Sequence, residues 1–289
     1  MTAGELVHEA AGRLMARDPG AARLEAELLL SFVLGLDRPG LYCRWDEVPA
    51  PGLRNTFQLL VERRLDGEPL AYLTGEREFM GLAFTVTPDV LVPRPETELL
   101  VETALAFLRE SRSPLVVDVG TGSGAIAVSL AVNLPTARLI AVDLSEAALV
   151  VARGNARRHG VGERISFRRR DLLTGIEGPV DLIAANLPYI PTGELDGLPD
   201  EVRREPRLAL NGGPDGLDIY RCLVPPAAGL LKPGGYLLAE LGPGEETGLL
   251  ALVQPPVWQA RVEKDWAVLP RLLVARRMES LDTCRVTNI

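Results

Sequence analysis

Apolar side chains recur with the period of an α-helix through the first 75 residues of the chain. Apolar positions follow helical spacing between residues 21 and 34, and again between residues 53 and 65. Thr2 can cap a helix that continues to residue 15, and turns rich in Gly or Pro near residues 18–20 and 48–52 separate the segments. Residues 1–75 are therefore predicted to form a helical bundle.

The pattern changes near residue 76. Residues 76–92 combine β-forming side chains with a Gly and a Pro-Asp break, which predicts a linking β-hairpin. Beyond residue 93 helical and strand patterns alternate. A helix is expected to start at Pro95, followed by strands at 115–119, 138–142, 165–168, 180–185, 235–241 and 269–275 and helices at 124–132, 146–159 and 217–230. This alternation predicts an α/β fold with a doubly wound, mostly parallel sheet over residues 93–277. Residues 278–289 are interpreted as a tail.

Composition narrows the class of protein. No window approaches 18 uncharged apolar residues, so we expect a soluble, cytoplasmic protein without a membrane segment. Three scattered Cys and two His favour reduced thiols and leave little material for a metal site or a Ser/His/Asp triad, so no metal is expected. A net charge of −8 disfavours stable binding to nucleic acid.

A glycine-rich turn follows the strand predicted at 115–119. In "VVDVGTGSGAIAV", Gly120, Gly122 and Gly124 stand between that strand and a helix, where a tight turn lets a ligand approach bare backbone. The spacing Gly120-x-Gly122-x-x-Ala125 also satisfies a loose dinucleotide fingerprint, so an NAD oxidoreductase is a competing interpretation.

Acidic residues near three successive strand ends favour a different ligand. Asp118 would repel a pyrophosphate but could hold a cationic amino-acid group, Asp143 can accept ribose hydroxyls, and Asp171 suits an adenine amino group. Each acid alone is equally consistent with a solvated strand end or a helix cap. Together they indicate S-adenosylmethionine, in a site that we expect to include Thr121, Leu144, Leu172 and Asn186 as well.

The stretch "ANLPYIP" ends the strand predicted at 180–185 with Asn186-Leu187-Pro188-Tyr189. With the glycine loop and the three acids, this tetrapeptide resembles the class I S-adenosylmethionine-dependent methyltransferases that act on a nitrogen conjugated to a π system. The hallmark of that group is an Asn/Asp-Pro-Pro-Tyr/Phe motif. It includes adenine-N6 DNA methyltransferases and protein-glutamine N5 methyltransferases.

Longer blocks separate these two. The segments "YLTGEREFMGLAF", "VLVPRPETE", "EPRLALNGGPDGLDIYR" and "LKPGGYLLAELG" are similar to the peptide chain release factor glutamine methyltransferase family, and the resemblance covers residues 1–277. The sequence departs from the family pattern at Leu187, where Pro is frequent, and at Glu245, where Gln commonly follows "LG".

The resemblance implies a Rossmann-like class I methyltransferase domain joined by the hairpin to the N-terminal helices. It implies a monomeric enzyme whose substrate is the Gln of the Gly-Gly-Gln loop of class 1 release factors, with residues 1–75 docking the substrate. Arg94 and Glu96, in the second block, are carried over as substrate-binding residues.

The tetrapeptide can act as a clamp for a planar NH₂ group. The Asn186 side-chain oxygen and the Pro188 carbonyl would each accept one N–H, Tyr189 would pack against the amide plane, and Leu187-Pro188 would stiffen the loop. Such a clamp also fits adenine, so an adenine-N6 nucleic-acid methyltransferase remains an alternative. A non-catalytic cofactor-binding module would not explain the clamp, and an NAD oxidoreductase would lack a His or Tyr-x-x-x-Lys set.

Overall fold

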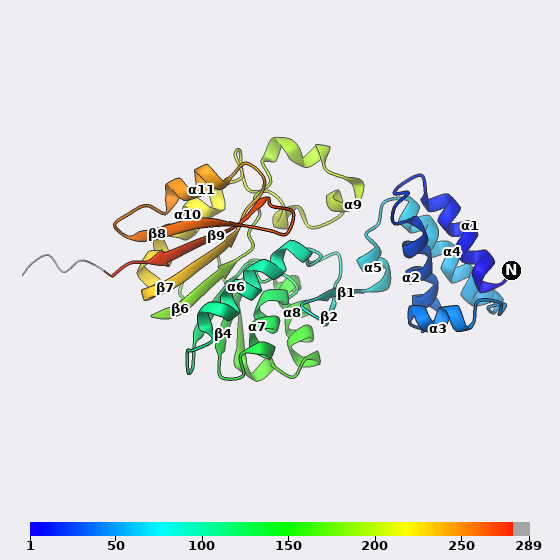
Figure 1. Ribbon diagram of the computed structural model, residues 1–289, viewed down its shortest axis with the longest axis horizontal. Helices are drawn as coiled ribbons and strands as arrows, with labels where there is room; N and C mark the ends of the chain where they lie inside the picture. Colours follow the sequence, from blue (N-terminus) through cyan, green and yellow to red (C-terminus); the bar gives the residue numbers. More distant parts are fainter. Residues whose placement is uncertain (280–289) are drawn as a thin grey trace, which may run out of the picture. The chain divides into compact units, whose positions relative to one another are not determined.

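The computed structural model describes residues 1–279 (Figure 1). The chain forms two compact units. The helical unit comprises Met1–Glu76 together with Leu198–Arg204, and the sheet unit comprises Arg77–Gly197 together with the chain from Glu205 onward. Each unit has its own core.

The helical unit is built from short amphipathic helices. It contains α1 (Ala3–Leu14), α2 (Ala22–Leu34), α3 (Arg38–Cys43), α4 (Pro51–Leu65), α5 (Leu70–Thr74) and the single turn α9 (Asp200–Arg203). Thr2 caps α1 through the backbone N–H of Glu5, as the sequence predicts. The apolar stripes of α1, α2 and α4 form the core, beside which Arg64 pairs with the nearly buried Glu25 at 2.6 Å. The short helices α3, α5 and α9 were not predicted, because six residues or fewer carry too little periodicity to read.

The sheet unit carries a seven-stranded sheet in the order β5-β4-β3-β6-β7-β9-β8. Strands β3 to β7 pair in parallel, whereas β9 is antiparallel to both β7 and β8. The strands are β3 (Leu115–Val119), β4 (Arg138–Asp143), β5 (Ile165–Arg169), β6 (Val180–Ala185), β7 (Leu231–Glu240), β8 (Trp258–Lys264) and β9 (Pro270–Arg277). The predicted doubly wound, mostly parallel sheet is confirmed.

Helices cover both faces of this sheet (Figure 1). Val116 packs on one side with α6 (Glu98–Leu108) and α7 (Ala125–Asn133), whereas Val117 packs on the other with α10 (Asp218–Leu230) and α11 (Glu246–Leu252). The side chains of a strand alternate between faces, so parallel strands buried on both sides are apolar along most of their length. This accounts for the largely apolar sequences of β3 and β6, in which Asp118 and Asp181 are the polar positions.

A two-stranded hairpin, β1 (Glu76–Phe79) and β2 (Leu82–Thr85), precedes the sheet. Asn155 from α8 (Glu146–Arg158) bonds to both backbone groups of Thr85, at 2.8 and 3.0 Å, and donates to the Ser123 carbonyl at 2.8 Å. The end of the hairpin is thereby tied to the glycine-rich loop.

Two elements of the sheet unit were not predicted, β8 and α11. Strand β8 is an edge strand in which only Trp258 is buried, so it lacks the apolar run of an internal strand. Helix α11 buries a single side chain, Leu249. Four short 3₁₀ turns complete the unit: η1 (Pro95–Thr97), η2 (Gly162–Arg164), η3 (Thr192–Gly197) and η4 (Arg207–Ala209).

The predicted tail, 278–289, lies almost entirely outside the described residues. Within residues 1–279, no helix is both long and apolar enough to span a bilayer. Cys43 and Cys222 are exposed free thiols, while Cys284 falls beyond the described chain.

Candidate active site

A cavity of about 600 Å³ opens at the carboxyl ends of β3, β4 and β6. Strand β3 lies between β4 and β6, so the chain order reverses there, which is where open α/β sheets bind their ligands. Most of the predicted site residues line this cavity: Arg94, Gly120, Thr121, Gly122, Asp143, Leu144, Asp171, Leu172, Asn186, Leu187 and Pro188. Of the predicted residues, Glu96, Asp118, Gly124 and Tyr189 are not part of its lining.

The glycine loop is held close to its neighbours on both sides. The N–H groups of Gly120 and Thr121 both donate to the Val142 carbonyl at 2.9 Å, which anchors the loop to β4. Gly120 has φ +73° and a Cβ there would lie 2.8 Å from Leu187 Cδ2. A Cβ on Gly124 would lie 3.1 Å from the Ala152 Cβ, so this glycine permits close packing of helices and does not contact the cavity.

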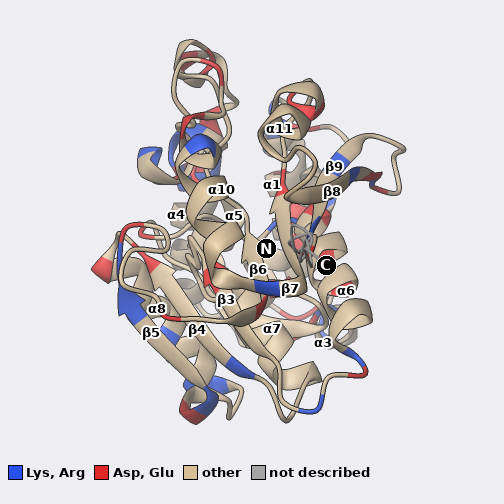
Figure 2. Ribbon diagram, turned by 90° about the vertical axis from the view of Figure 1, so that its left-hand side faces the viewer, with Lys and Arg blue, Asp and Glu red and all other residues tan. Residues whose placement is uncertain are grey.

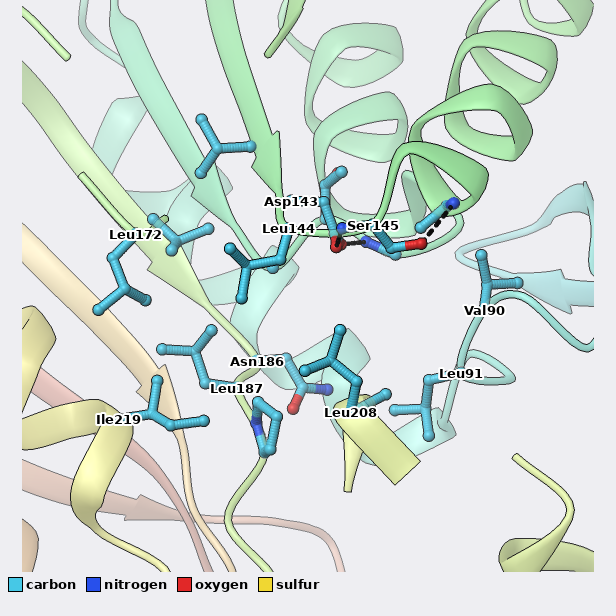
Figure 3. A pocket seen from close by; sticks show the side chains of 18 of the residues that line it. Val90, Leu91, Asp143, Leu144, Ser145, Leu172, Asn186, Leu187, Leu208 and Ile219 are labelled. Atoms are coloured by element: carbon cyan, nitrogen blue, oxygen red, sulfur yellow. Dashed lines mark hydrogen bonds between the residues drawn. The ribbon is translucent and has the colours of Figure 1, made fainter. Parts of the chain in front are cut away.

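Asp143 presents a fixed carboxylate to the cavity (Figure 3). One oxygen accepts from the Gly122 N–H at 2.9 Å and the other from the Ser145 N–H at 2.9 Å. Each carboxylate oxygen has a further lone pair for a ligand hydroxyl. Asp171 also lines the cavity and is exposed.

Asp118 is fully buried beneath the glycine loop. Its Oδ2 accepts from the Thr121 hydroxyl at 2.6 Å and from the Ala127 N–H at 3.1 Å, which ties the loop to the first turn of α7. Oδ1 has no hydrogen-bond partner among the described residues, and burial raises the pKa of this carboxyl to about 7. A direct contact with a cationic ligand group stays a prediction.

The Asn186 carboxamide is oriented by a chain of hydrogen bonds. Its Nδ2 donates to Thr97 Oγ1 at 3.0 Å, and the Thr97 hydroxyl donates to Glu240 Oε2 at 2.6 Å. Because Nδ2 is engaged with Thr97, Oδ1 is the end of the amide left for a ligand N–H. Behind the loop, the buried Tyr220 hydroxyl accepts from the Leu187 N–H and donates to the Glu240 carbonyl.

Pro188 and Tyr189 pack against a glycine-rich segment. No hydrogen bond from residues 1–279 reaches the Pro188 carbonyl oxygen, which lies 2.8 Å from where a Cβ on Gly212 would be. A Cβ on Gly242 would lie 2.8 Å from Tyr189 Cδ2, so the ring rests on this glycine behind the cavity wall. Burial, followed by the Glu240 charge, raises the pKa of Tyr189 to about 12.

Arg94 lies on the cavity wall and is paired with the carboxylate of Glu205, which is 1% exposed. Glu205 also accepts from the Val92 N–H at 3.0 Å, so it holds the loop that leads into η1. The structure therefore shows a structural partner for the predicted Arg94.

Sequence reasoning missed most of the apolar wall and the groups behind Asn186. Val90, Leu91, Leu208 and Ile219 face the cavity in Figure 3, from segments far apart in the chain. Thr97 lines the cavity as well, and Glu240 reaches it through Thr97. Thr97 and Glu240 lie in two of the segments that resemble the family, "VLVPRPETE" and "LKPGGYLLAELG". This resemblance was the only indication in the sequence that they belong to the site.

The lining fits S-adenosylmethionine. Asp143 offers acceptors for hydroxyls, the positive-φ Gly120 and Gly122 leave bare backbone at the wall, and Leu144 and Leu172 offer apolar surface for a flat base. Within residues 1–279, no cluster of His, Cys, Asp and Glu could hold a metal ion.

Fold and cavity define a class I S-adenosylmethionine-dependent methyltransferase. Residues 95–196 match the family described as "Methyltransferase small domain". The crystal structure of the hMettl16 catalytic domain in complex with MAT2A 3'UTR hairpin 6 has a similar fold, with a TM-score of 0.57, 14% identity, and coverage of 78% of this chain and 82% of that chain.

Relatives narrow the class. Residues 5–75 match the "PrmC N-terminal domain". The release factor glutamine methyltransferase of Moorella thermoacetica is 48% identical over 96% of this chain and 100% of its own length. That of Deinococcus radiodurans is 42% identical over 94% and 98%. The chain belongs to the release factor glutamine methyltransferase family.

Proposed function

We propose that this chain transfers a methyl group from S-adenosylmethionine to the side-chain amide nitrogen, N5, of the Gln in the Gly-Gly-Gln motif of class 1 peptide chain release factors. One observation carries the proposal. Asn186 is held by Thr97 with its Oδ1 free, in the wall of the cavity that the Asp143 carboxylate and the glycine loop also line. The names of the relatives support this substrate.

We assign the cofactor to the part of the cavity around Asp143. The carboxylate accepts the ribose hydroxyls, Leu144 and Leu172 flank the base, and Asp171 accepts from the adenine amino group. Asp118 braces the loop through Thr121; it lies outside the cavity lining, so its unpartnered Oδ1 would accept from the cationic end only if the glycine loop moved aside. When bound, S-adenosylmethionine supplies an electrophilic methyl group on a sulfonium sulfur.

The chain's own contribution is to orient a poor nucleophile. A carboxamide nitrogen reacts weakly because its lone pair is delocalised into the carbonyl group. Asn186 Oδ1 and the Pro188 carbonyl accept no hydrogen bond from residues 1–279. They accept the two N–H groups of the substrate amide and direct the face of the nitrogen toward the methyl group. Positioning and fixed dipoles of this kind lower the barrier without deprotonating the amide in advance.

We propose further that the enzyme is a cytoplasmic monomer, that residues 1–75 dock the folded release factor, and that nucleic acid is not bound stably. The net charge of −8 supports the last point. Basic residues follow one another at the end of β5, at Arg168, Arg169 and Arg170, where Figure 2 shows the ribbon in blue. One short run of this kind is typical of a solvated face.

Labelling with tritiated S-adenosylmethionine tests the proposal. Purified release factor should acquire label on the Gly-Gly-Gln glutamine, as located by mass spectrometry, while duplex DNA should acquire none. A release factor with Glu in place of that Gln should stay unlabelled, because a carboxylate has no N–H for the two acceptors. Label in DNA, or on the Glu variant, would refute the proposal.

A further inference from the structure

We propose that Thr97 and Glu240 are positioning residues that set which end of the Asn186 carboxamide faces the substrate. The proposed relay runs from the Glu240 carboxylate through the Thr97 hydroxyl to the Asn186 amide. It deepens the function proposed above and rests on it for the kinetic part of its test only.

Two of these three groups are shielded from water, while Asn186 is partly exposed on the cavity wall. Glu240 is 2% exposed at the end of β7, and Thr97 is 4% exposed at the end of η1. The contacts are 2.6 Å from Thr97 Oγ1 to Glu240 Oε2 and 3.0 Å from Asn186 Nδ2 to Thr97 Oγ1. Because Thr97 and Glu240 are buried, few other groups compete for the protons in these hydrogen bonds. Each bond therefore has a defined donor and acceptor.

The direction follows from the inventory of donors and acceptors. A hydroxyl has one proton and two lone pairs, whereas an ionised carboxylate only accepts. With Glu240 ionised, the Thr97 proton goes to the carboxylate, and Thr97 Oγ1 then meets Asn186 as an acceptor. The NH₂ of Asn186 must turn toward Thr97, so Oδ1 is presented to the cavity.

Protonation of Glu240 removes this constraint. A neutral carboxyl can donate to Thr97, whose own proton is then free to bond Asn186 Oδ1. The amide in that state turns its NH₂ group toward the substrate NH₂, and two donors face each other. The rate of methyl transfer should therefore fall when Glu240 takes up a proton.

The groups around Glu240 give its carboxyl a pKa within the pH range in which the enzyme can be assayed. Burial raises the pKa of Glu240 to about 7, and the charge of Glu96 also raises it. The hydrogen bond from Thr97 and the charges of Arg271 and Arg94 lower this pKa, but by less than burial raises it. Arg271 comes from β9 and is itself paired with Asp265 at 3.1 Å. The Tyr220 hydroxyl donates to the Glu240 backbone carbonyl, and the Glu240 charge also acts on Tyr189; burial raises the pKa of both tyrosines.

The first readout does not depend on the substrate. In ¹⁵N-labelled protein, the side-chain NH₂ signals of Asn186, assigned by their loss in Asn186→Ala, should shift with pH as Glu240 titrates, with a midpoint near 7. In Thr97→Val the same signals should no longer respond over this range. Signals of Asn186 that do not move with pH in the wild type would overturn the relay, whatever the substrate proves to be.

The second readout is kinetic. With a Gly-Gly-Gln peptide, Thr97→Val should lower kcat by about 10- to 100-fold, with KM and the affinity for S-adenosylhomocysteine within about twofold of wild type. Thr97→Ser keeps the hydroxyl and should recover most of the rate. Thr103→Val removes another buried hydroxyl of the α6 region, outside the cavity, and serves as the matched control with wild-type kcat.

The pH profile separates positioning from stability. Wild-type kcat should rise through pH 7 as Glu240 ionises, and kcat of Thr97→Val should be nearly flat from pH 6 to 8. A Thr97→Val enzyme with unchanged kcat would overturn the proposal, and so would one that is slow but keeps the wild-type pH profile. Failure of Thr97→Ser to recover the rate would count equally against it.

Discussion

Glu245→Gln should stabilise the protein at alkaline pH but not at acid pH. Glu245 is 8% exposed; its Oε2 accepts from the Gly242 N–H at 2.7 Å, while Oε1 has no partner among the described residues. A Cβ on Gly216 would lie 2.1 Å from Oε1 and 2.2 Å from the Tyr189 carbonyl oxygen, so two acceptors crowd the same space. A Gln NH₂ group in the place of Oε1 could donate to that carbonyl.

The magnitude follows from proton linkage. Burial raises the pKa of Glu245 from 4.5 to about 7. The hydrogen bond from the Gly242 N–H lowers this pKa, while the charges of Asp215 and Glu194 raise it. Because the folded-state pKa is the higher one, the folded state binds more protons between pH 4.5 and 7. The free energy of unfolding therefore falls as pH rises through that window. One pKa unit corresponds to about 1.4 kcal/mol, so the full cost of ionisation is about 3 kcal/mol.

Urea unfolding of both proteins at pH 5 and pH 8 measures this. We expect the two free energies to agree within about 1 kcal/mol at pH 5, and Glu245→Gln to exceed wild type by about 1 to 3 kcal/mol at pH 8. Glu110→Gln, at an exposed position of the same unit, should change neither value by more than about 0.5 kcal/mol. An equal effect of Glu245→Gln at both pH values would contradict the reasoning, because it would not involve ionisation.

Four further variants test the assignments in the cavity and the docking role of the helices. Asp143→Ala should weaken binding of S-adenosylhomocysteine in calorimetry by roughly 1 to 3 kcal/mol, since ribose hydroxyls would lose their acceptor; unchanged affinity would exclude the assignment. Asn186→Ala should lower the methyl-transfer rate by about 100-fold or more with cofactor affinity retained, and a parallel loss of affinity would make Asn186 a structural residue. Gly212→Ala would place a methyl group 2.7 Å from Tyr189 Cα and 2.8 Å from the Pro188 carbonyl oxygen, so activity should fall while cofactor affinity changes little; full activity would show that the clamp tolerates displacement. Leu59 lies on α4 with its side chain 65% exposed. Leu59→Glu should slow labelling of folded release factor more than labelling of a Gly-Gly-Gln peptide, and an equal loss of rate for both substrates would contradict docking on that face.

The elements that carry strong periodicity were predictable, and so was the edge of the sheet on which the site lies. Strands β3 and β6 were placed at their observed bounds because burial on both faces makes most positions apolar, with Asp118 and Asp181 as the exceptions. Carboxyl ends of parallel strands share one edge, so Asp143, Asp171 and Asn186 were expected to come together, and they line one cavity.

What could not be predicted depends on contacts between distant segments. Thr97 and Glu240 are separated by 143 positions, and neither local pattern indicates that one accepts the proton of the other. Asp118 stands at the expected strand end, yet its side chain turns beneath the loop because Thr121 and Ala127 offer donors there. Direction of a side chain at a strand end is decided by such tertiary partners, which spacing along the chain does not encode.

The hydrogen bonds of Asn155 connect the β1–β2 hairpin to the wall of the cavity. Its carboxamide completes the edge of β2 as a neighbouring strand would, while the same NH₂ group holds Ser123 of the glycine-rich loop. If a ligand displaced that loop, the planar Asn155 carboxamide would transmit the movement to Thr85. A fluorophore or a ¹⁹F label in place of the exposed Thr85 side chain could thus report cavity occupancy in real time, without radiolabel, substrate protein or turnover.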